Sequence, residues 1–161
     1  MSICNNVMLT DMVYNGQKVK EWHHNDVLVY RSAVAYRVVF TDYPITITSS
    51  RGSVKTAETL SSGYKLNAKK DGNSGSNGQV KASVSLPTQG CNKVDISYRC
   101  TNATAASVNG ATIVSTFTPD VSDKITLGCS GDTLELNLEL NENTAYYTAG
   151  LLITEIYFYN D

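Results

Sequence analysis

The sequence contains little cysteine, and its few cysteines lie far apart. Four cysteines occur among the 161 residues, Cys4, Cys91, Cys100 and Cys129, and no two of them have CxxC spacing. A disulfide scaffold in a chain of this length would need more of them, and a structural zinc site would need closer ligands. We therefore expect free, half-buried thiols, and a bridge between Cys91 and Cys100 only if the chain is oxidised.

Charge is also scarce, and the two signs nearly balance. Charged residues make up 17% of the chain, and the formal net charge is −2. This gives no electrostatic reason to expect nucleic acid or an anionic membrane as a partner. No apolar run approaches the roughly 20 residues that a membrane-spanning helix needs, so no membrane insertion is expected. The opening Met-Ser-Ile-Cys-Asn-Asn lacks the basic and apolar regions of a signal peptide, which predicts synthesis in a cytoplasm.

What the chain does contain is β-strand patterning. Hydrophobic residues make up 42% of the sequence and prolines number three, so a packed core is expected. Apolar and polar residues alternate in several segments, most clearly over 134–140, where four leucines alternate with Glu135, Asn137 and Glu139. The segment 150–160 is apolar at neighbouring positions, which is typical of a strand covered on both faces. Turn residues separate these segments at roughly 8–12-residue spacing, which predicts an all-β antiparallel sandwich or barrel.

The organisation of the chain changes near residue 36. Before it, the pattern predicts a small β-meander with strands at 7–14, 17–23 and 27–31 and turns at Asn15-Gly16 and Asn25-Asp26. Strands so few and short do not bury enough apolar surface to be stable alone. We therefore divide the chain into an attachment segment, 1–36, that must dock onto something, and an outer β-sandwich domain, 41–161.

The attachment segment resembles a short motif of tailed-bacteriophage structural proteins. The stretch "VYNGQKVKEWHHNDVLVYRS" is similar to a motif in which an "NGxxV" strand is followed by an aromatic residue, a polar turn and "VLVY", ahead of a variable outer domain. The resemblance implies a virion protein made in the host cytoplasm and bound to other virion proteins, as a homo-oligomer. The residues that we expect to anchor it are Tyr14, Val19, Trp22, His23, His24, Val27, Val29 and Tyr30.

The C-terminal part resembles a different group of domains. The stretch "DTLELNLELNENTAYYTAGLLITEIYFYND" is similar to the closing strands of galactose-binding-like jelly rolls, which occur in phage tail proteins and in carbohydrate-binding modules. The resemblance implies that the outer domain is a β-sandwich of the jelly-roll type.

Residues with possible catalytic or metal-binding chemistry are poorly arranged for it. His23 and His24 are adjacent, so in a strand they point to opposite faces. The Asp71–Gly78 loop only begins like a calcium loop, because Ala82 stands where a bidentate glutamate is required. Glu135 and Glu139 are separated along one strand by roughly 13 Å, beyond the carboxylate spacings of glycoside hydrolases. We expect no enzyme activity, no metal and no cofactor.

Sugar recognition needs exposed aromatic faces beside amide or carboxylate groups. Four tyrosines lie near predicted strand ends beside Asp or Asn residues and are the candidates for glycan contact: Tyr43, Tyr64, Tyr146 and Tyr147. Most tyrosines in a β domain are packing residues with a solvated hydroxyl, so that role remains the alternative for each of them.

These observations favour a structural component of a bacteriophage virion. The meander would attach the protein, and the sandwich would contact bacterial surface polysaccharide, with weak contacts made effective by many copies. Two alternatives stay open. One is a purely structural decoration or stabilising protein of the capsid or tail without a ligand, and the other is a carbohydrate-binding module of a cellular enzyme.

Overall fold

The computed structural model describes residues 35–73 and 75–160 and, before them, the backbone of four short strands. These strands are β1 (Val13–Tyr14), β2 (Gln17–Lys18), β3 (Glu21–His24) and β4 (Val27–Arg31). β1 pairs with β2 across residues 15–16 and β3 pairs with β4 across residues 25–26, and the residues of the two predicted turns themselves lie outside the described ones. The segment predicted as one strand over 17–23 contributes β2 and β3 to two separate two-stranded sheets, and residues 19–20 between them lie outside the described residues.

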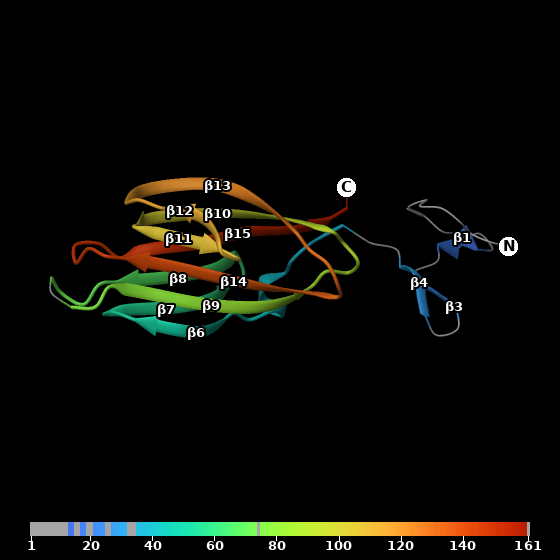
Figure 1. Cartoon of the computed structure of the whole chain (residues 1–161), viewed down its shortest axis with the longest axis horizontal. Helices are drawn as coiled ribbons and strands as arrows, with labels where there is room; N and C mark the ends of the chain where they lie inside the picture. The colour runs from blue at the N-terminus through green and yellow to red at the C-terminus, as the bar shows by residue number, and fades with distance from the viewer. Residues whose placement is uncertain are drawn as a thin grey trace.

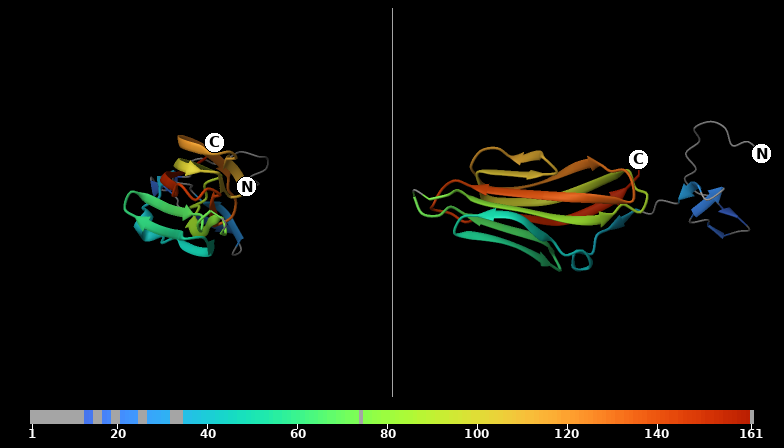
Figure 2. Two further views of the ribbon diagram at one scale, coloured as in Figure 1. Left: turned by 90° about the vertical axis from the view of Figure 1, so that its left-hand side faces the viewer. Right: turned by 60° about the horizontal axis from the view of Figure 1, so that its bottom comes forward.

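The rest of the described chain forms a sandwich of two antiparallel sheets whose strands run along the long axis of the molecule (Figures 1 and 2). Sheet 1 has the order β13-β10-β15-β8-β7, and β5 adds to it beside β15; sheet 2 has the order β12-β11-β14-β9-β6. The strands of sheet 1 are β5 (Tyr36–Arg37), β7 (Val54–Leu60), β8 (Gly63–Lys69), β10 (Lys93–Ala103), β13 (Thr118–Gly128) and β15 (Ala149–Tyr159). The strands of sheet 2 are β6 (Thr46–Arg51), β9 (Gly78–Pro87), β11 (Ala105–Val108), β12 (Ala111–Val114) and β14 (Thr133–Glu142).

The path of the chain between the sheets is that of a jelly roll. From β8 onward the chain crosses from one sheet to the other at every connection except the β11–β12 hairpin. This places β8, β15, β10 and β13 side by side in one layer and β9, β14, β11 and β12 in the other, the arrangement of two Greek keys in eight strands. The predicted all-β antiparallel sandwich of jelly-roll type is confirmed. Among the described residues the only helical element is the 3₁₀ turn η1 (Phe40–Asp42).

The leucine alternation of β14 supplies the middle of the core. Leu136, Leu138 and Leu140 are at most 1% exposed, whereas Glu135 and Asn137 between them are exposed. β14 lies between β9 and β11, and its three leucines are opposite Val84, Ala82 and Val80 of β9, all of which are also buried. A strand with one dry and one wet face therefore forms where the sequence predicts it.

The apolar pattern of β15 arises from a β-bulge and not from cover on both faces of the strand. Ser97 of β10 pairs with Glu155, but Tyr98 pairs with Ile153, so Thr154 is the extra residue of a β-bulge. The bulge changes which positions face inward, from Leu151 and Ile153 before it to residues 156 and 158 after it, all of which are buried. The interpretation of two covered faces is wrong, because the outward side chains of β15 remain partly exposed.

The segment that leads into the sandwich is packed against it. In β5, Tyr36 stacks on Phe158 with ring centroids 5.1 Å apart, and its hydroxyl donates to the carbonyl of Pro87. Val38 and Phe40 follow and are buried in the core. The core therefore begins at β5, within a few residues of the proposed boundary at 36–41, which itself stays a prediction.

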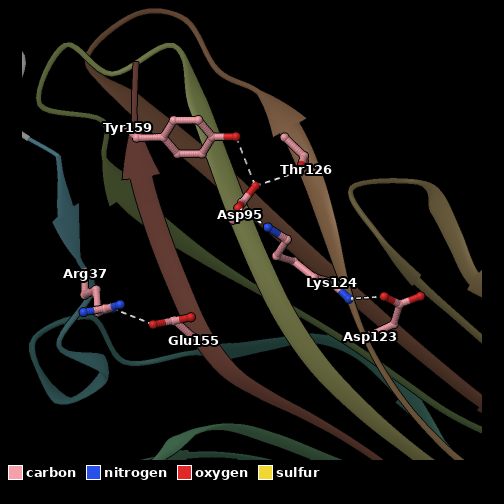
Figure 3. A network of polar contacts seen from close by, with 7 residues as sticks. All are labelled: Arg37, Asp95, Asp123, Lys124, Thr126, Glu155 and Tyr159. Carbon is pink, nitrogen blue, oxygen red and sulfur yellow. Dashed lines mark hydrogen bonds and ion pairs between the residues drawn. The ribbon is translucent and has the colours of Figure 1, made fainter. Parts of the chain in front are cut away.

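A polar network crosses the outer face of sheet 1 at the end where β5 lies (Figure 3). Asp95 of β10 accepts hydrogen bonds from Lys124 at 2.5 Å and Thr126 at 2.6 Å, both on β13, and from Tyr159 of β15 at 3.2 Å. On the other side of β15, Arg37 pairs with Glu155 at 2.5 Å. These cross-strand contacts join four neighbouring strands, β5, β15, β10 and β13, by side chains as well as by the backbone.

The two ends of the sandwich differ. We call the end that carries the β8–β9, β12–β13 and β14–β15 loops the far end, and the opposite end, where β5 and the C-terminus of β15 lie, the near end (Figure 1). β1 to β4 lie beyond the near end (Figure 1). Any group on the far-end loops is thus at the opposite end of the sandwich from the N-terminal strands.

Candidate functional site at the far end

Exposed aromatic side chains gather at the far end. Among the described residues, five large hydrophobic side chains are exposed, and three of these are aromatic: Phe117 at 44%, Tyr146 at 79% and Tyr147 at 47%. Phe117 belongs to the β12–β13 loop and the two tyrosines to the β14–β15 loop. We call these three residues the far-end aromatic cluster. The other two exposed side chains, Val39 and Ile47, lie outside these loops.

Strand pairing explains why the two loops meet. β10 lies between β13 and β15, and its last residue, Ala103, pairs with Thr118, the first residue of β13. Phe117 directly precedes Thr118, and Tyr147 precedes the start of β15 by two residues. The two rings come from the strands on either side of β10 and contact each other with centroids 5.6 Å apart and planes tilted by 33°. Because they lie on loops held by a rigid sheet, the rings are presented together.

A buried carboxylate lies at the start of the tyrosine loop. Glu142 continues the inward-facing row of leucines on β14 and is completely buried. Its Oε1 accepts the backbone N–H of Thr144 at 2.6 Å, whereas its Oε2 and the Thr144 hydroxyl have no hydrogen-bond partner in the structure. Thr104, the residue before β11, also fixes the start of this loop, because its backbone N–H and its hydroxyl both donate to the Asn141 carbonyl. These contacts fix the point from which Tyr146 and Tyr147 project.

The four tyrosines singled out in the sequence are not brought together. Tyr146 and Tyr147 belong to the far-end aromatic cluster, but Tyr43 follows η1, and Tyr64 pairs with Ile153 in the middle of β15. Tyr64 is fully buried; its hydroxyl donates to the Tyr43 carbonyl at 2.7 Å, and its ring meets Phe40 edge-on. Burial, followed by the proximity of Tyr43, raises the pKa of Tyr64 to about 12. Tyr64 is a core residue and cannot touch a glycan.

Sequence reasoning missed two residues of this site. Phe117 follows a short strand in "STFTP", and an isolated phenylalanine before a Thr-Pro turn gives no periodic pattern by which to recognise it. Glu142 did carry a recognisable pattern, because it falls two positions beyond Leu140 in the same alternation. A glutamate there is an inward-facing charge and marks an unusual position.

For seven of the eight predicted anchoring residues the structure describes the backbone alone. The backbone places Trp22 opposite Tyr30, His23 opposite Leu28 and His24 opposite Val27 in the β3–β4 pair. Tyr14 lies in β1 and Val29 in β4, whereas Val19 lies outside the described residues. The role of all eight residues in attachment stays a prediction.

The other polar candidates of the sequence lie where they do no recognisable chemistry. Glu135 and Glu139 are on the outer face of β14, and Asp71 is in the exposed β8–β9 loop. Within residues 35–73 and 75–160 no three His, Cys, Asp or Glu side chains are grouped to hold a metal ion. None of the helical elements in that part of the chain is long and apolar enough to cross a membrane.

The structure describes three of the four cysteines. Cys129 is half-buried, as the sequence predicted. Cys91 and Cys100 are buried and are therefore less accessible than predicted. Burial raises the pKa of Cys100 to about 12 and also raises that of Cys91, where Cys129 contributes as well. Cys91 lies beside Cys129, whose Sγ is 3.2 Å from the Cys91 carbonyl oxygen. Raised pKa values make these thiols poor nucleophiles.

The outer face of sheet 2 carries a polar network that is already satisfied. Gln79 donates to both Glu139 and Asn141 at 2.9 Å, Asn141 donates to Glu139 at 3.1 Å, and Lys81 pairs with Glu139 at 3.1 Å. Burial by itself would raise the pKa of Glu139, but the hydrogen bonds from Asn141, Lys81 and Gln79 lower it overall. Its carboxylate is therefore ionised and occupied by its own neighbours, which favours a stabilising role over ligand binding.

The chain is similar to several solved structures, all at low sequence identity. No protein-family model matches the chain, and no curated protein matches it in sequence. A low-affinity xylan-binding module, CBM86, from Roseburia intestinalis is 14% identical with a TM-score of 0.41 over 78% of this chain and 95% of that one. The enzymatically active domain of bacteriophage CBA120 tailspike protein 4 is 12% identical with a TM-score of 0.38, over 73% of this chain and 19% of that one. The CBM51-2 and INT domains of Clostridium perfringens ZmpB are 10% identical with a TM-score of 0.31, over 71% of this chain and 30% of that one.

Proposed function

We propose that the protein is a non-enzymatic glycan-binding β-sandwich whose far-end aromatic cluster contacts sugar rings. The observation that carries the proposal is the exposure of Phe117, Tyr146 and Tyr147 together on two loops. Exposed aromatic side chains on a soluble domain mark binding surfaces, and flat aromatic faces pack well on the C–H faces of pyranose rings.

The polar surroundings of the cluster support contact with a neutral, hydroxyl-rich sugar ring at this place. Apart from Ala145 and the rings themselves, the residues of the two loops carry hydroxyl or amide side chains, and Glu142, which precedes the tyrosine loop, is buried. Hydroxyl and amide groups exchange hydrogen bonds with sugar hydroxyls without the desolvation cost of a charge. The exposed residues of this kind in the two loops are Ser115, Thr116, Asn143 and Thr148.

We further propose that the protein is displayed on a bacteriophage virion, attached through residues 1–36. The far-end aromatic cluster is at the opposite end of the sandwich from β1 to β4, which is the arrangement that an attached, outward-facing binding domain needs. Three exposed rings provide a small contact area, so a single copy is expected to bind weakly. Several copies on one particle would raise the effective affinity without any new contact.

The first prediction tests the cluster directly. In the full chain, Tyr147→Ala and Tyr146→Ala should each weaken binding to the host-surface polysaccharide selected by a glycan array by about tenfold, the loss of roughly 1–1.5 kcal/mol of aromatic contact. Binding is measured by calorimetry or by retention on immobilised polysaccharide. The matched control is Val39→Ala, an exposed apolar side chain outside the cluster, which should bind like wild type.

The alternatives predict other results. A purely structural decoration protein would bind no polysaccharide on the array, and its loss would lower particle stability. A module of a cellular enzyme would keep its binding, but residues 1–36 would attach it to no particle. Unchanged binding in both tyrosine variants would contradict the proposed site.

A further inference from the structure

A groove lies on the outer face of sheet 1, close to the far end. Its volume is about 290 Å³, and it crosses the three central strands β8, β15 and β10. We call it the flank groove. The side chains that line it are Lys65, Asn67, Arg99, Thr101, Leu151 and Leu152, with Gly150 among them.

Gly150 opens the floor of the flank groove. It pairs with Asn67 on one side and with Thr101 on the other, so the three residues form one row across the sheet. A Cβ at position 150 would lie only 2.8 Å from the Thr101 hydroxyl oxygen, so any side chain would fill the gap. Asn67 donates its amide to Thr56 at 3.0 Å, which leaves its carbonyl oxygen, 3.8 Å from the same point, to accept a hydrogen bond. The row thus offers the Asn67 carbonyl oxygen on one side of Gly150 and the Thr101 hydroxyl on the other.

The next row of the same groove carries positive charge. Leu152 pairs with Lys65 on β8 and with Arg99 on β10. Arg99 is committed to Asp120, which accepts two hydrogen bonds from it at 3.0 and 2.7 Å. Lys65 is exposed and has no hydrogen-bond or ion-pair partner among the residues that the structure describes. The groove therefore combines one unpaired ammonium group with an apolar side chain.

We infer that the flank groove binds a sugar residue that carries a carboxylate, a uronic acid, as a second subsite beside the far-end aromatic cluster. The carboxylate would pair with Lys65, the C–H face of the ring would pack on Leu152 and Gly150, and the hydroxyls would meet Asn67 and Thr101. A singly charged group fits better than a phosphate, because Asp120 and Glu58, the β7 neighbour of Lys65, add negative charge nearby.

The position of the groove connects this inference to the proposed function, on which its glycan ligand rests. Gly150 follows Tyr147 by three residues, which is about 10 Å at the rise of an extended chain. One polysaccharide chain would reach both places, with one sugar on the aromatic rings and an acidic sugar in the flank groove. The ligand class of the whole surface is then an acidic polysaccharide.

The second prediction separates the flank groove from the cluster. Two probes of equal length, an oligogalacturonate and a neutral galactose oligomer, are titrated into the full chain at low and at physiological ionic strength. Wild type should prefer the acidic probe, and Lys65→Gln should weaken binding of that probe about tenfold and leave the neutral probe unchanged. The control, Lys55→Gln on the neighbouring edge strand, removes the same charge outside the groove and should bind like wild type.

A second variant tests the flank groove by changing its shape and not its charge. Gly150→Ala should weaken the acidic probe by closing the gap beside Thr101, with the melting temperature recorded to exclude unfolding. Equal affinity for the two probes, or an unchanged affinity of Lys65→Gln for the acidic one, would overturn the flank groove. Loss of neutral binding in Tyr147→Ala alone would then still support the cluster. Loss of acidic binding in Lys65→Gln without any effect of Tyr147→Ala would support the groove and contradict the cluster.

Discussion

At the scale of single residues, the inward and outward positions of β14 carry very different shares of the stability. Leu138 is buried in the middle of the sandwich, whereas Glu135 on the same strand points to solvent. A buried leucine contributes through transfer from water and through its contacts, and its removal leaves a cavity that the surrounding strands cannot close. An exposed side chain contributes little. The inward-facing row of β14 therefore combines buried leucines, which stabilise the fold strongly, with one buried carboxylate, Glu142, whose removal from water costs free energy.

The third prediction belongs to this scale. Leu138→Ala should lower the free energy of unfolding by about 2–5 kcal/mol, because it leaves a cavity between the two sheets. Glu135→Ala, three positions away and on the outer face, should change it by no more than about 0.5 kcal/mol. Denaturant titration of both variants gives the comparison, and equal effects would contradict the described orientation of β14.

At the scale of the elements, cross-strand side chains hold the edge strand β13 on sheet 1. Asp95 of β10 is central, because it accepts from Lys124 and Thr126 of β13. The hydrogen bond from Lys124, followed by that from Thr126, holds the pKa of Asp95 below its usual value. A pKa that is lower in the folded state means that the ionised form stabilises the fold. That stabilisation is present above the pKa of the unfolded chain, about 4, and is lost as the pH falls through the folded value.

The fourth prediction follows from this sign. Asp95→Asn should be less stable than wild type at neutral pH, and the difference should shrink as the pH falls below about 4, because the carboxylate is protonated first in the unfolded chain and, at still lower pH, in the folded protein. Thermal melts across the acid range measure it. Lys124→Gln, which removes the main donor, should show part of the same change. A stability gap that stays constant from neutral to acid pH would refute the role assigned to Asp95.

At the scale of the whole molecule, we expect the two ends of the sandwich to have separate tasks. The near end receives the chain from β1 to β4 and is fastened by Tyr36, Val38 and Phe40, while the far end carries the exposed rings. A rigid sandwich between them keeps the binding loops away from the attachment segment. Changes in the side chains of one end are therefore expected to leave the side-chain contacts of the other end unchanged, since the two groups of residues are far apart.

The fifth prediction tests this separation. Trp22→Ala should reduce incorporation of the protein into the virion and leave both the melting temperature of the sandwich and its glycan binding unchanged. Incorporation is measured by quantifying the protein in purified particles, and Tyr147→Ala serves as the converse control, with normal incorporation and weak binding. A Trp22→Ala protein that unfolds as a whole would place this residue in the main core instead.

The sequence alone determined the strand pattern, because side chains in a strand alternate with a period of two whatever the strand pairs with. This is why β14 could be predicted from its alternating leucines. Tertiary structure decided everything that depends on which strands become neighbours. It placed a bulge at Thr154, which reverses the inward face of β15, and it buried Tyr64. It also brought Phe117 onto Tyr147 and set Lys65, Gly150 and Thr101 across three strands, since residues far apart in sequence meet only when the register of the sheet is set.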